Sequence, residues 1–198
     1  HGKSRNIPLG SDFNLFTAWE DIIRVLNFLK IKNSHFVGIS FGTLLILKLL
    51  ETHKKYINKS VLAGAITSFN RFTRFLLLCV NLLKSVLPNM LLYKLFAYII
   101  MPKSNHKESR RIFIQEAKVI DSKVFKQWLN LTSDLKKYIL RLRSINFNKY
   151  ILFLSGKGDY LFSEDVREFA SKNKMLSYCS IEGAGHVVNI DNPSIFNK

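Results

Sequence analysis

Hydrophobic residues near the start of the chain recur at helical spacing. Between residues 13 and 30 an apolar side chain returns every three or four positions, which places these side chains on one face of an α-helix. Ser11 or Asp12 is expected to cap the helix, because either side chain can accept hydrogen bonds from its first backbone amides. The pattern therefore predicts an amphipathic helix that packs against a core.

The spacing of apolar residues then changes. The short run 34–38 predicts a strand, the almost wholly apolar stretch 43–53 a buried helix, and 59–65 a second strand. Two strands joined by one helix in such close succession form a βαβ unit, whose strands are parallel. A strand, a helix and a strand are again expected near the C-terminus, at 149–156, 163–171 and 176–185. The sequence thus predicts an α/β fold with a mostly parallel sheet flanked by helices.

A long stretch with little strand signal separates these two parts. It predicts five helices, at 69–87, 89–101, 106–119, 121–131 and 133–143. Because the strand and helix alternation resumes afterwards, we interpret residues 67–145 as a helical cap inserted into a core of residues 1–66 and 146–198. Charged residues and Pro88 interrupt the most apolar part of the cap, so two short helices are expected there and not a membrane span.

The charge of the chain is strongly positive. Thirty Lys and Arg residues against 14 Asp and Glu residues give a net charge of +16, while 47% hydrophobic residues exclude a disordered chain. Half of the cationic residues lie within 67–145. Such a charge favours anionic partners. No nucleic-acid-binding module is recognisable, so we expect no nucleic-acid partner and consider peripheral contact of the basic cap with an anionic membrane. The oligomeric state stays open.

The two cysteines give little chemistry. Cys79 and Cys179 lie far apart among apolar residues and are expected to be buried, reduced thiols. No signal peptide is visible, and together these features favour a cytoplasmic protein, with a membrane-peripheral position as the alternative. No His, Cys, Asp or Glu group has the spacing of a metal site, so neither a metal nor an organic cofactor is expected.

The motif GISFG, residues 38–42, joins a predicted strand to a predicted helix. A serine between two glycines is either an ordinary turn residue or a nucleophile held above the sheet in a tight turn. In the second case Gly38 and Gly42 must be small, because larger side chains would collide with the neighbouring backbone. The amide of Phe41 would lie at a helix N-terminus, where it can donate to an oxyanion. The context favours Ser40 as a nucleophile.

A nucleophilic serine needs a base and an acid that orients it. Asp159 follows a predicted strand, and His186 follows the last strand after small residues that leave room for an imidazole. Asp191 is the nearest rival acid and is expected to cap the final helix instead. His106 is expected in a polar turn of the cap, with a structural or solvent-exposed role.

These motifs resemble those of the α/β-hydrolase family along nearly the whole chain. GISFG looks like the nucleophile elbow, GKGDYLF like the acid loop, GAGHVVNIDNP like the histidine loop, and the opening HGKS like the loop after the family's fourth strand. The resemblance implies that Ser40 is the nucleophile, His186 the base and Asp159 the orienting acid. It also implies that the helical insert is the family's cap.

The resemblance implies a serine hydrolase that acts on an ester-type small molecule. The apolar cap favours a lipophilic acyl group. The family's first strands would precede residue 1, so the second hypothesis is a truncated, inactive hydrolase scaffold, associated with membranes through its basic cap.

Overall fold

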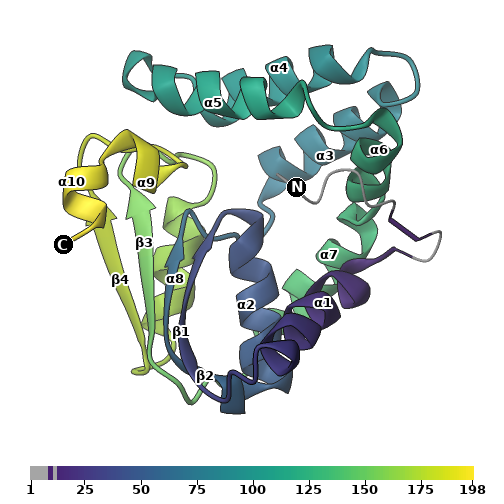
Figure 1. Ribbon diagram of the computed structural model, residues 1–198. Helices are drawn as coiled ribbons and strands as arrows, with labels where there is room; N and C mark the ends of the chain where they lie inside the picture. Colours follow the sequence, from purple (N-terminus) through teal and green to yellow (C-terminus); the bar gives the residue numbers. More distant parts are fainter. Residues whose placement is uncertain (1–8, 11–12) are drawn as a thin grey trace.

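The computed structural model describes residues 9–10 and 13–198, with residues 132 and 133 described in the backbone only. The HGKS motif and the expected caps Ser11 and Asp12 lie outside the described residues. A sheet of four parallel strands forms the centre of the molecule (Figure 1). In spatial order the strands are β1 (Ser34–Ile39), β2 (Ile57–Ala63), β3 (Ile151–Gly156) and β4 (Leu176–Ile181). The predicted α/β fold with a parallel sheet is confirmed.

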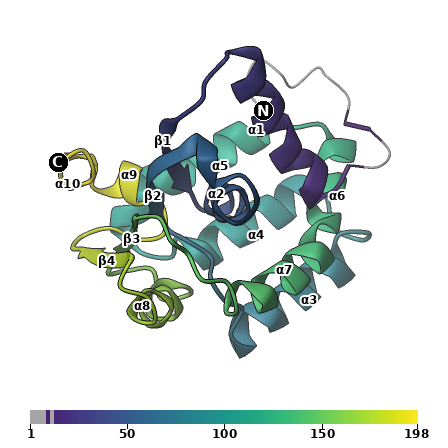
Figure 2. The same cartoon turned by 90° about the horizontal axis from the view of Figure 1, so that it is seen from below.

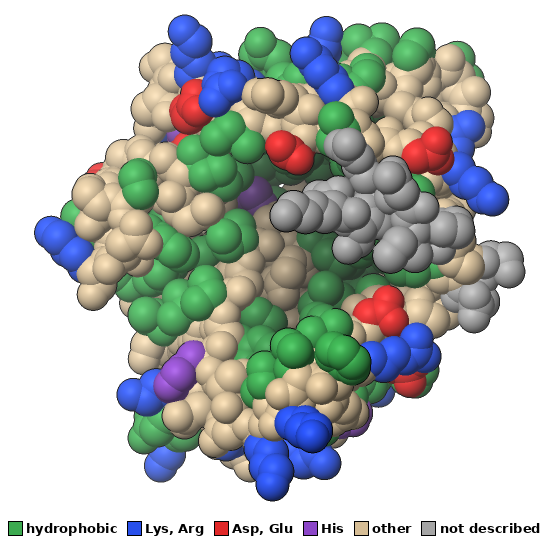
Figure 3. Space-filling view, viewed as in Figure 1, with side chains coloured by type: hydrophobic (Ala, Val, Ile, Leu, Met, Phe, Trp, Pro, Cys, Tyr) green, Lys and Arg blue, Asp and Glu red, His purple; other side chains and the backbone are tan. Residues whose placement is uncertain are grey.

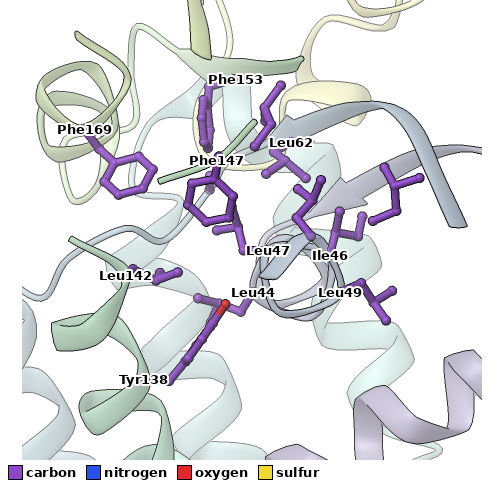
Figure 4. Close-up of a cluster of buried hydrophobic side chains, with 14 of the residues drawn as sticks. Leu44, Ile46, Leu47, Leu49, Leu62, Tyr138, Leu142, Phe147, Phe153 and Phe169 are labelled. Atoms are coloured by element: carbon purple, nitrogen blue, oxygen red, sulfur yellow. The ribbon is translucent and has the colours of Figure 1, made fainter. Parts of the chain in front are cut away.

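One face of this sheet is covered by four helices. They are α1 (Leu15–Phe28), α2 (Phe41–Thr52), α7 (Thr132–Leu142) and α8 (Ser163–Ser171). Figure 2 shows α2 in the centre, between the sheet and the helices α1 and α7. Leu44 and Leu47 of α2 are fully buried, and Phe153 of β3 meets Phe169 of α8 edge to face with ring centroids 5.9 Å apart (Figure 4). This packing buries the almost wholly apolar α2, as its sequence predicts.

A smaller apolar cluster lies on the opposite face of the sheet. Two short helices, α9 (Val188–Asp191) and α10 (Pro193–Phe196), follow β4 there. Cys179 of β4 is exposed and Cys79 is half buried, and both thiols are free. The expectation of a buried thiol is wrong for Cys179, because it lies on an edge strand of the described sheet, on a face that α9 and α10 cover only in part.

The first helix begins two residues later than its apolar pattern suggests. Asn14 is its N-cap, and the Asn14 side chain accepts hydrogen bonds from the amides of Phe16 (2.8 Å) and Thr17 (3.1 Å). The Thr17 hydroxyl accepts in return from the amide of Asn14 at 3.0 Å, which completes a capping box. The predicted cap at Ser11 or Asp12 is therefore wrong.

Five helices lie between β2 and β3 in the chain. Besides α7 they are α3 (Arg71–Leu83), α4 (Asn89–Ile100), α5 (Lys107–Ala117) and α6 (Ser122–Asn130). Figure 1 shows α4 and α5 above the carboxyl ends of the strands. Pro88 separates α3 from α4 as expected, and no helix in the described part of the chain is long and apolar enough to cross a membrane. Because α7 contributes Tyr138 and Leu142 to the main core, the domain boundaries at 67 and 145 stay a prediction.

Candidate active site

Ser40 occupies the single residue between β1 and α2. Its backbone lies at φ 51° and ψ −118°, a conformation that costs a residue with a side chain about 1–3 kcal/mol. The Ser40 amide donates to the carbonyl of Ala63 at 2.9 Å, so the turn is anchored to the end of β2. A strained serine at a strand-to-helix junction is what a nucleophile elbow requires, since this geometry lifts the hydroxyl above the sheet.

The two glycines of the motif differ in what surrounds them. A Cβ atom at Gly38 would lie 2.6 Å from Cδ1 of Ile46 and 3.1 Å from the Gly42 carbonyl, so no side chain fits there without movement. A Cβ atom at Gly42 would meet nothing within 4 Å in the described structure. The expected steric requirement therefore applies to Gly38. It is wrong for Gly42. The backbone of Gly42 instead limits the space at Gly38, because its carbonyl group lies beside the position of a Cβ atom there.

The structure brings the three predicted side chains together. Ser40 Oγ lies 2.8 Å from Nε2 of His186, and Nδ1 of the same ring lies 2.8 Å from Oδ2 of Asp159. They come from the carboxyl ends of β1, β3 and β4, which a parallel sheet places at one edge. His186 and Asp159 are buried, while Ser40 is partly exposed.

The contacts define the direction of each hydrogen bond. An ionised carboxylate accepts only, so Nδ1 of His186 must carry the proton that is donated to Asp159. Nε2 is then the acceptor for the hydroxyl of Ser40. The ring of Phe162 lies 5.2 Å from the imidazole and shields it. The imidazole is therefore oriented as a base toward the serine.

Phe41 is the first residue of α2, so its amide has no carbonyl one turn earlier within the helix to bond with. Its ring stands edge to face against Trp128 of α6 at 5.1 Å. The amide thus lies beside the serine at the positive end of the helix dipole, the position expected for an oxyanion donor.

The loop that carries His186 is held by groups that sequence reasoning missed. Asp191 accepts a hydrogen bond from the amide of Gly185 at 2.7 Å and another from the hydroxyl of Ser109 at the start of α5. Asn192, not Asp191, caps the last helix, so the expected capping role of Asp191 is wrong. Only the fold could reveal this, because Ser109 lies 82 positions earlier in the chain.

For His106 the sequence left a structural or a solvent-exposed role open, and the structure shows a buried side chain. It is fully buried in a 3-10 turn (Ser104–His106), and neither ring nitrogen has a hydrogen-bond partner in the described structure. A Cβ atom at Gly185 would lie 2.5 Å from the imidazole, so the ring packs directly on the backbone beside His186. The cap therefore touches the histidine loop through an imidazole.

Burial lowers the pKa of His106 below its ordinary value. The charges around the ring partly oppose one another. The carboxylates of Asp191 and Asp159 raise the pKa of His106, whereas Lys103 and Arg110 lower it. Loss of solvation has the largest effect, so the neutral imidazole is favoured.

A cavity of about 590 Å³ opens beside Ser40 and His186. Its walls come mostly from α3 to α6, with single residues from α2 and α7 and two from the loop after β3. No Lys, Arg, Asp or Glu side chain of the described structure lines it. Burial raises the pKa of Tyr93, whose phenol therefore stays neutral in the wall. Figure 3 shows a hollow beneath the cap flanked by hydrophobic side chains. The cavity is thus suited to the apolar part of a molecule whose reacting atom lies beside Ser40 Oγ.

Within the described residues, no group of three or more His, Cys, Asp and Glu side chains is arranged to hold a metal ion. The chemical groups of the site are the hydroxyl, the imidazole, the carboxylate and the backbone amides described above. Such a set can perform acyl transfer through a serine nucleophile.

The fold and this constellation define an α/β hydrolase. A model of the alpha/beta hydrolase fold matches residues 1–193, and the chain belongs to that family. None of the curated proteins compared with it is a significant sequence match.

Solved structures of similar fold include hydrolases from several bacteria. A hydrolase from Pseudomonas aeruginosa PA01 has a TM-score of 0.79 at 16% identity, over 96% of this chain and 71% of that one. The esterase EaEST from Exiguobacterium antarcticum has a TM-score of 0.76 at 21% identity, over 92% and 70% of the two chains. The enol-lactonase from Burkholderia xenovorans LB400 has 0.74 at 17%, over 96% and 72%. At these identities the likeness shows the fold.

Proposed function

We propose that the protein is a serine hydrolase that cleaves carboxylic esters with a lipophilic acyl group. The observation that carries this proposal is the unbroken chain of contacts from Ser40 through His186 to Asp159, each 2.8 Å long. An ordinary turn serine does not need a buried imidazole as its partner, nor a buried carboxylate that orients the imidazole, whereas a nucleophilic serine needs both. The esterase and lactonase among the structural neighbours act as support at the level of the fold.

In the proposed reaction Ser40 Oγ attacks the ester carbonyl and its proton passes to Nε2 of His186. The Phe41 amide donates to the carbonyl oxygen as that oxygen becomes negative. The C–O bond to the alcohol then breaks, and the proton on His186 leaves with the alcohol. Water then attacks the acyl-serine carbonyl and gives its proton to the same nitrogen. The bond between the acyl carbon and Ser40 Oγ breaks, Oγ takes the proton back from His186, and the acid is released. Asp159 keeps the ring in its tautomer and stabilises the imidazolium.

The apolar cavity supports the choice of acyl group. A space of about 590 Å³ without charged walls favours an alkyl or aryl chain over an ionic one, because burying a charge there would cost far more than burying methylene groups gains. A gain of about 0.8 kcal/mol per buried methylene predicts that the specificity constant rises as the acyl chain lengthens. The increase should stop when the cavity is full.

Labelling with a fluorophosphonate probe tests the nucleophile. The native chain should react, Ser40→Ala should not, and His186→Ala should react much more slowly, while the matched controls Ser144→Ala and His35→Ala react as the native chain does. Both control side chains belong to exposed residues outside the site. A correctly folded chain, shown by circular dichroism, that the probe does not label would contradict the proposal and favour the inactive scaffold. A series of p-nitrophenyl esters from acetate to decanoate tests the acyl preference separately.

A further inference from the structure

The helices α3 and α4 are hydrophobic on two opposite sides. Their inner sides, with Leu76 and Phe96 among others, line the cavity. Their outer sides and the turn between them also carry large apolar side chains, each between 43% and 77% exposed: Phe72, Phe75, Leu82, Val86, Leu91 and Leu95. We call these six residues the cap outer face. Helices of this kind are usually buried on all sides, so an uncovered second apolar side indicates a surface that binds something.

The charged residues of α3, α4 and the turn between them are all positive. No Asp or Glu occurs in the sequence between Glu51 and Glu108. Four cations belong to the two helices and the turn between them, and none of them forms an ion pair within the described structure: Arg71, Arg74, Lys84 and Lys94. Figure 3 shows hydrophobic side chains beside Lys and Arg side chains along the upper edge of the molecule, where α4 and α5 lie. Apolar groups next to unpaired cations fit a partner that is both apolar and anionic.

A hollow beside α3 is also lined by cations. It has a volume of about 520 Å³, and Arg74, Lys84 and Lys136 line it together with Leu78, which is itself 57% exposed. The ammonium group of Lys84 is directed to Asn81 at 3.0 Å and to Asn130 at 2.9 Å. Three cations and no carboxylate line this hollow, so its charge suits an anionic group such as a phosphate.

We propose that the cap outer face docks on the surface of an anionic lipid bilayer. The apolar side chains enter the interface, and the cations contact the phosphates of the head groups. A second copy of the chain is a poor alternative occupant, because it would bring the same cations against each other. The inner sides of the same helices line the cavity, so a chain docked in this way holds that cavity next to the lipid. The contact itself does not depend on the proposed reaction.

Vesicle flotation tests this inference with the full chain carrying Ser40→Ala, so that binding is measured without hydrolysis. The vesicles contain phosphatidylcholine alone or phosphatidylcholine mixed with phosphatidylglycerol. We expect the native surface to bind the mixed vesicles more tightly and to release them as salt is added. Inorganic phosphate matched in ionic strength to the salt should compete no better than the salt does.

Two pairs of double variants separate the apolar from the charged contribution. Phe75→Ser with Leu82→Ser should lower partition into both kinds of vesicle at least about tenfold, because two side chains no longer enter the interface. The matched control, Leu140→Ser with Tyr150→Ser, removes equally exposed apolar groups elsewhere and should change it less than about twofold.

The charge variants leave the apolar residues unchanged. Arg71→Gln with Lys94→Gln should lower partition about 20-fold on the anionic vesicles only. The control Lys59→Gln with Lys174→Gln removes the same charge at exposed residues outside α3 and α4, and it should lower partition much less. Unchanged binding in both cap variants would overturn the inference. Displacement by inorganic phosphate alone would assign the hollow to a free anion and also overturn it. So would a dimer that Phe75→Ser with Leu82→Ser dissociates, in a chain that does not bind vesicles.

Discussion

The two glycines around Ser40 should respond in opposite ways to the same substitution. Gly38→Ala places a methyl group 2.6 Å from Cδ1 of Ile46 and 3.1 Å from the backbone of Gly42. Atoms at 2.6 Å must move apart, and the backbone of α2 cannot move without shifting the serine. Gly42→Ala places its methyl group in open space within α2.

The size of each effect follows from these contacts. Overpacking of this kind costs about 1–3 kcal/mol of the free energy of unfolding, which corresponds to a fall in Tm of about 4–8 °C for a 2 kcal/mol loss in a chain of this length. Gly42→Ala should instead gain about 0.5 kcal/mol, because alanine restricts the unfolded chain and favours the helix. The variants are otherwise identical, so the difference isolates the steric contact.

A second substitution tests which atom is responsible. Ile46→Val removes Cδ1 and alone should cost about 1 kcal/mol. Combined with Gly38→Ala it should cost about 1 kcal/mol less than the sum of the two single losses, since the shortest contact is gone while the contact with Gly42 remains.

Thermal unfolding followed by circular dichroism measures all four chains, and labelling by the fluorophosphonate probe reports on the serine in each. Equal Tm values for Gly38→Ala and Gly42→Ala would refute the reasoning. Additive losses in the double variant would show that Ile46 Cδ1 does not form the limiting contact.

Three further outcomes are expected. Ser109→Ala removes the hydroxyl that donates to Asp191, whose carboxylate holds the loop of His186. The rate of labelling by the fluorophosphonate probe should therefore fall about tenfold, and Ser109→Thr should restore it. An unchanged rate in Ser109→Ala would contradict the role of this contact. Because burial lowers the pKa of His106 in the folded chain, the unfolded chain takes up a proton first as the pH falls below about 6.5, and Tm should fall from there. This acid loss of Tm should be smaller in His106→Leu, and an identical pH profile would exclude the effect. Val80→Phe places a larger side chain in the cavity wall and so reduces the volume of the cavity. The value of kcat/KM for the octanoate ester should therefore fall about tenfold relative to that for the butyrate ester. An unaltered ratio would show that the acyl chain does not lie against Val80.

Local patterns were sufficient for most of the elements and for choosing three side chains that the structure brings together. The helix predicted at 163–171 is α8. The strands predicted at 34–38 and 59–65 begin and end within two residues of β1 and β2. Periodicity works here because one side of each element faces a single core. Motifs that resemble those of the α/β-hydrolase family pointed to Ser40, Asp159 and His186. Each of these residues follows a strand, and parallel strands bring their carboxyl ends to one edge.

Two contacts between distant parts of the chain could not be predicted. Asp191 was expected to cap the final helix, yet its partner Ser109 belongs to α5. His106 was expected in a structural or solvent-exposed role, and only the structure shows that it is buried against Gly185. Neither contact leaves a periodic signal, because the spacing between the partners is set by how the cap folds back onto the core.

The sequence by itself determined the strands, the helices and the order serine, aspartate, histidine, since these depend on side-chain periodicity and on short motifs. Only the tertiary structure decided that Ser40 and His186 meet at 2.8 Å, that a cavity of about 590 Å³ opens beside them, and that the outer side of α3 and α4 is uncovered. The reason is physical: a distance or a cavity depends on the packing of many side chains at once, whereas a periodic pattern records only which side of each element is apolar.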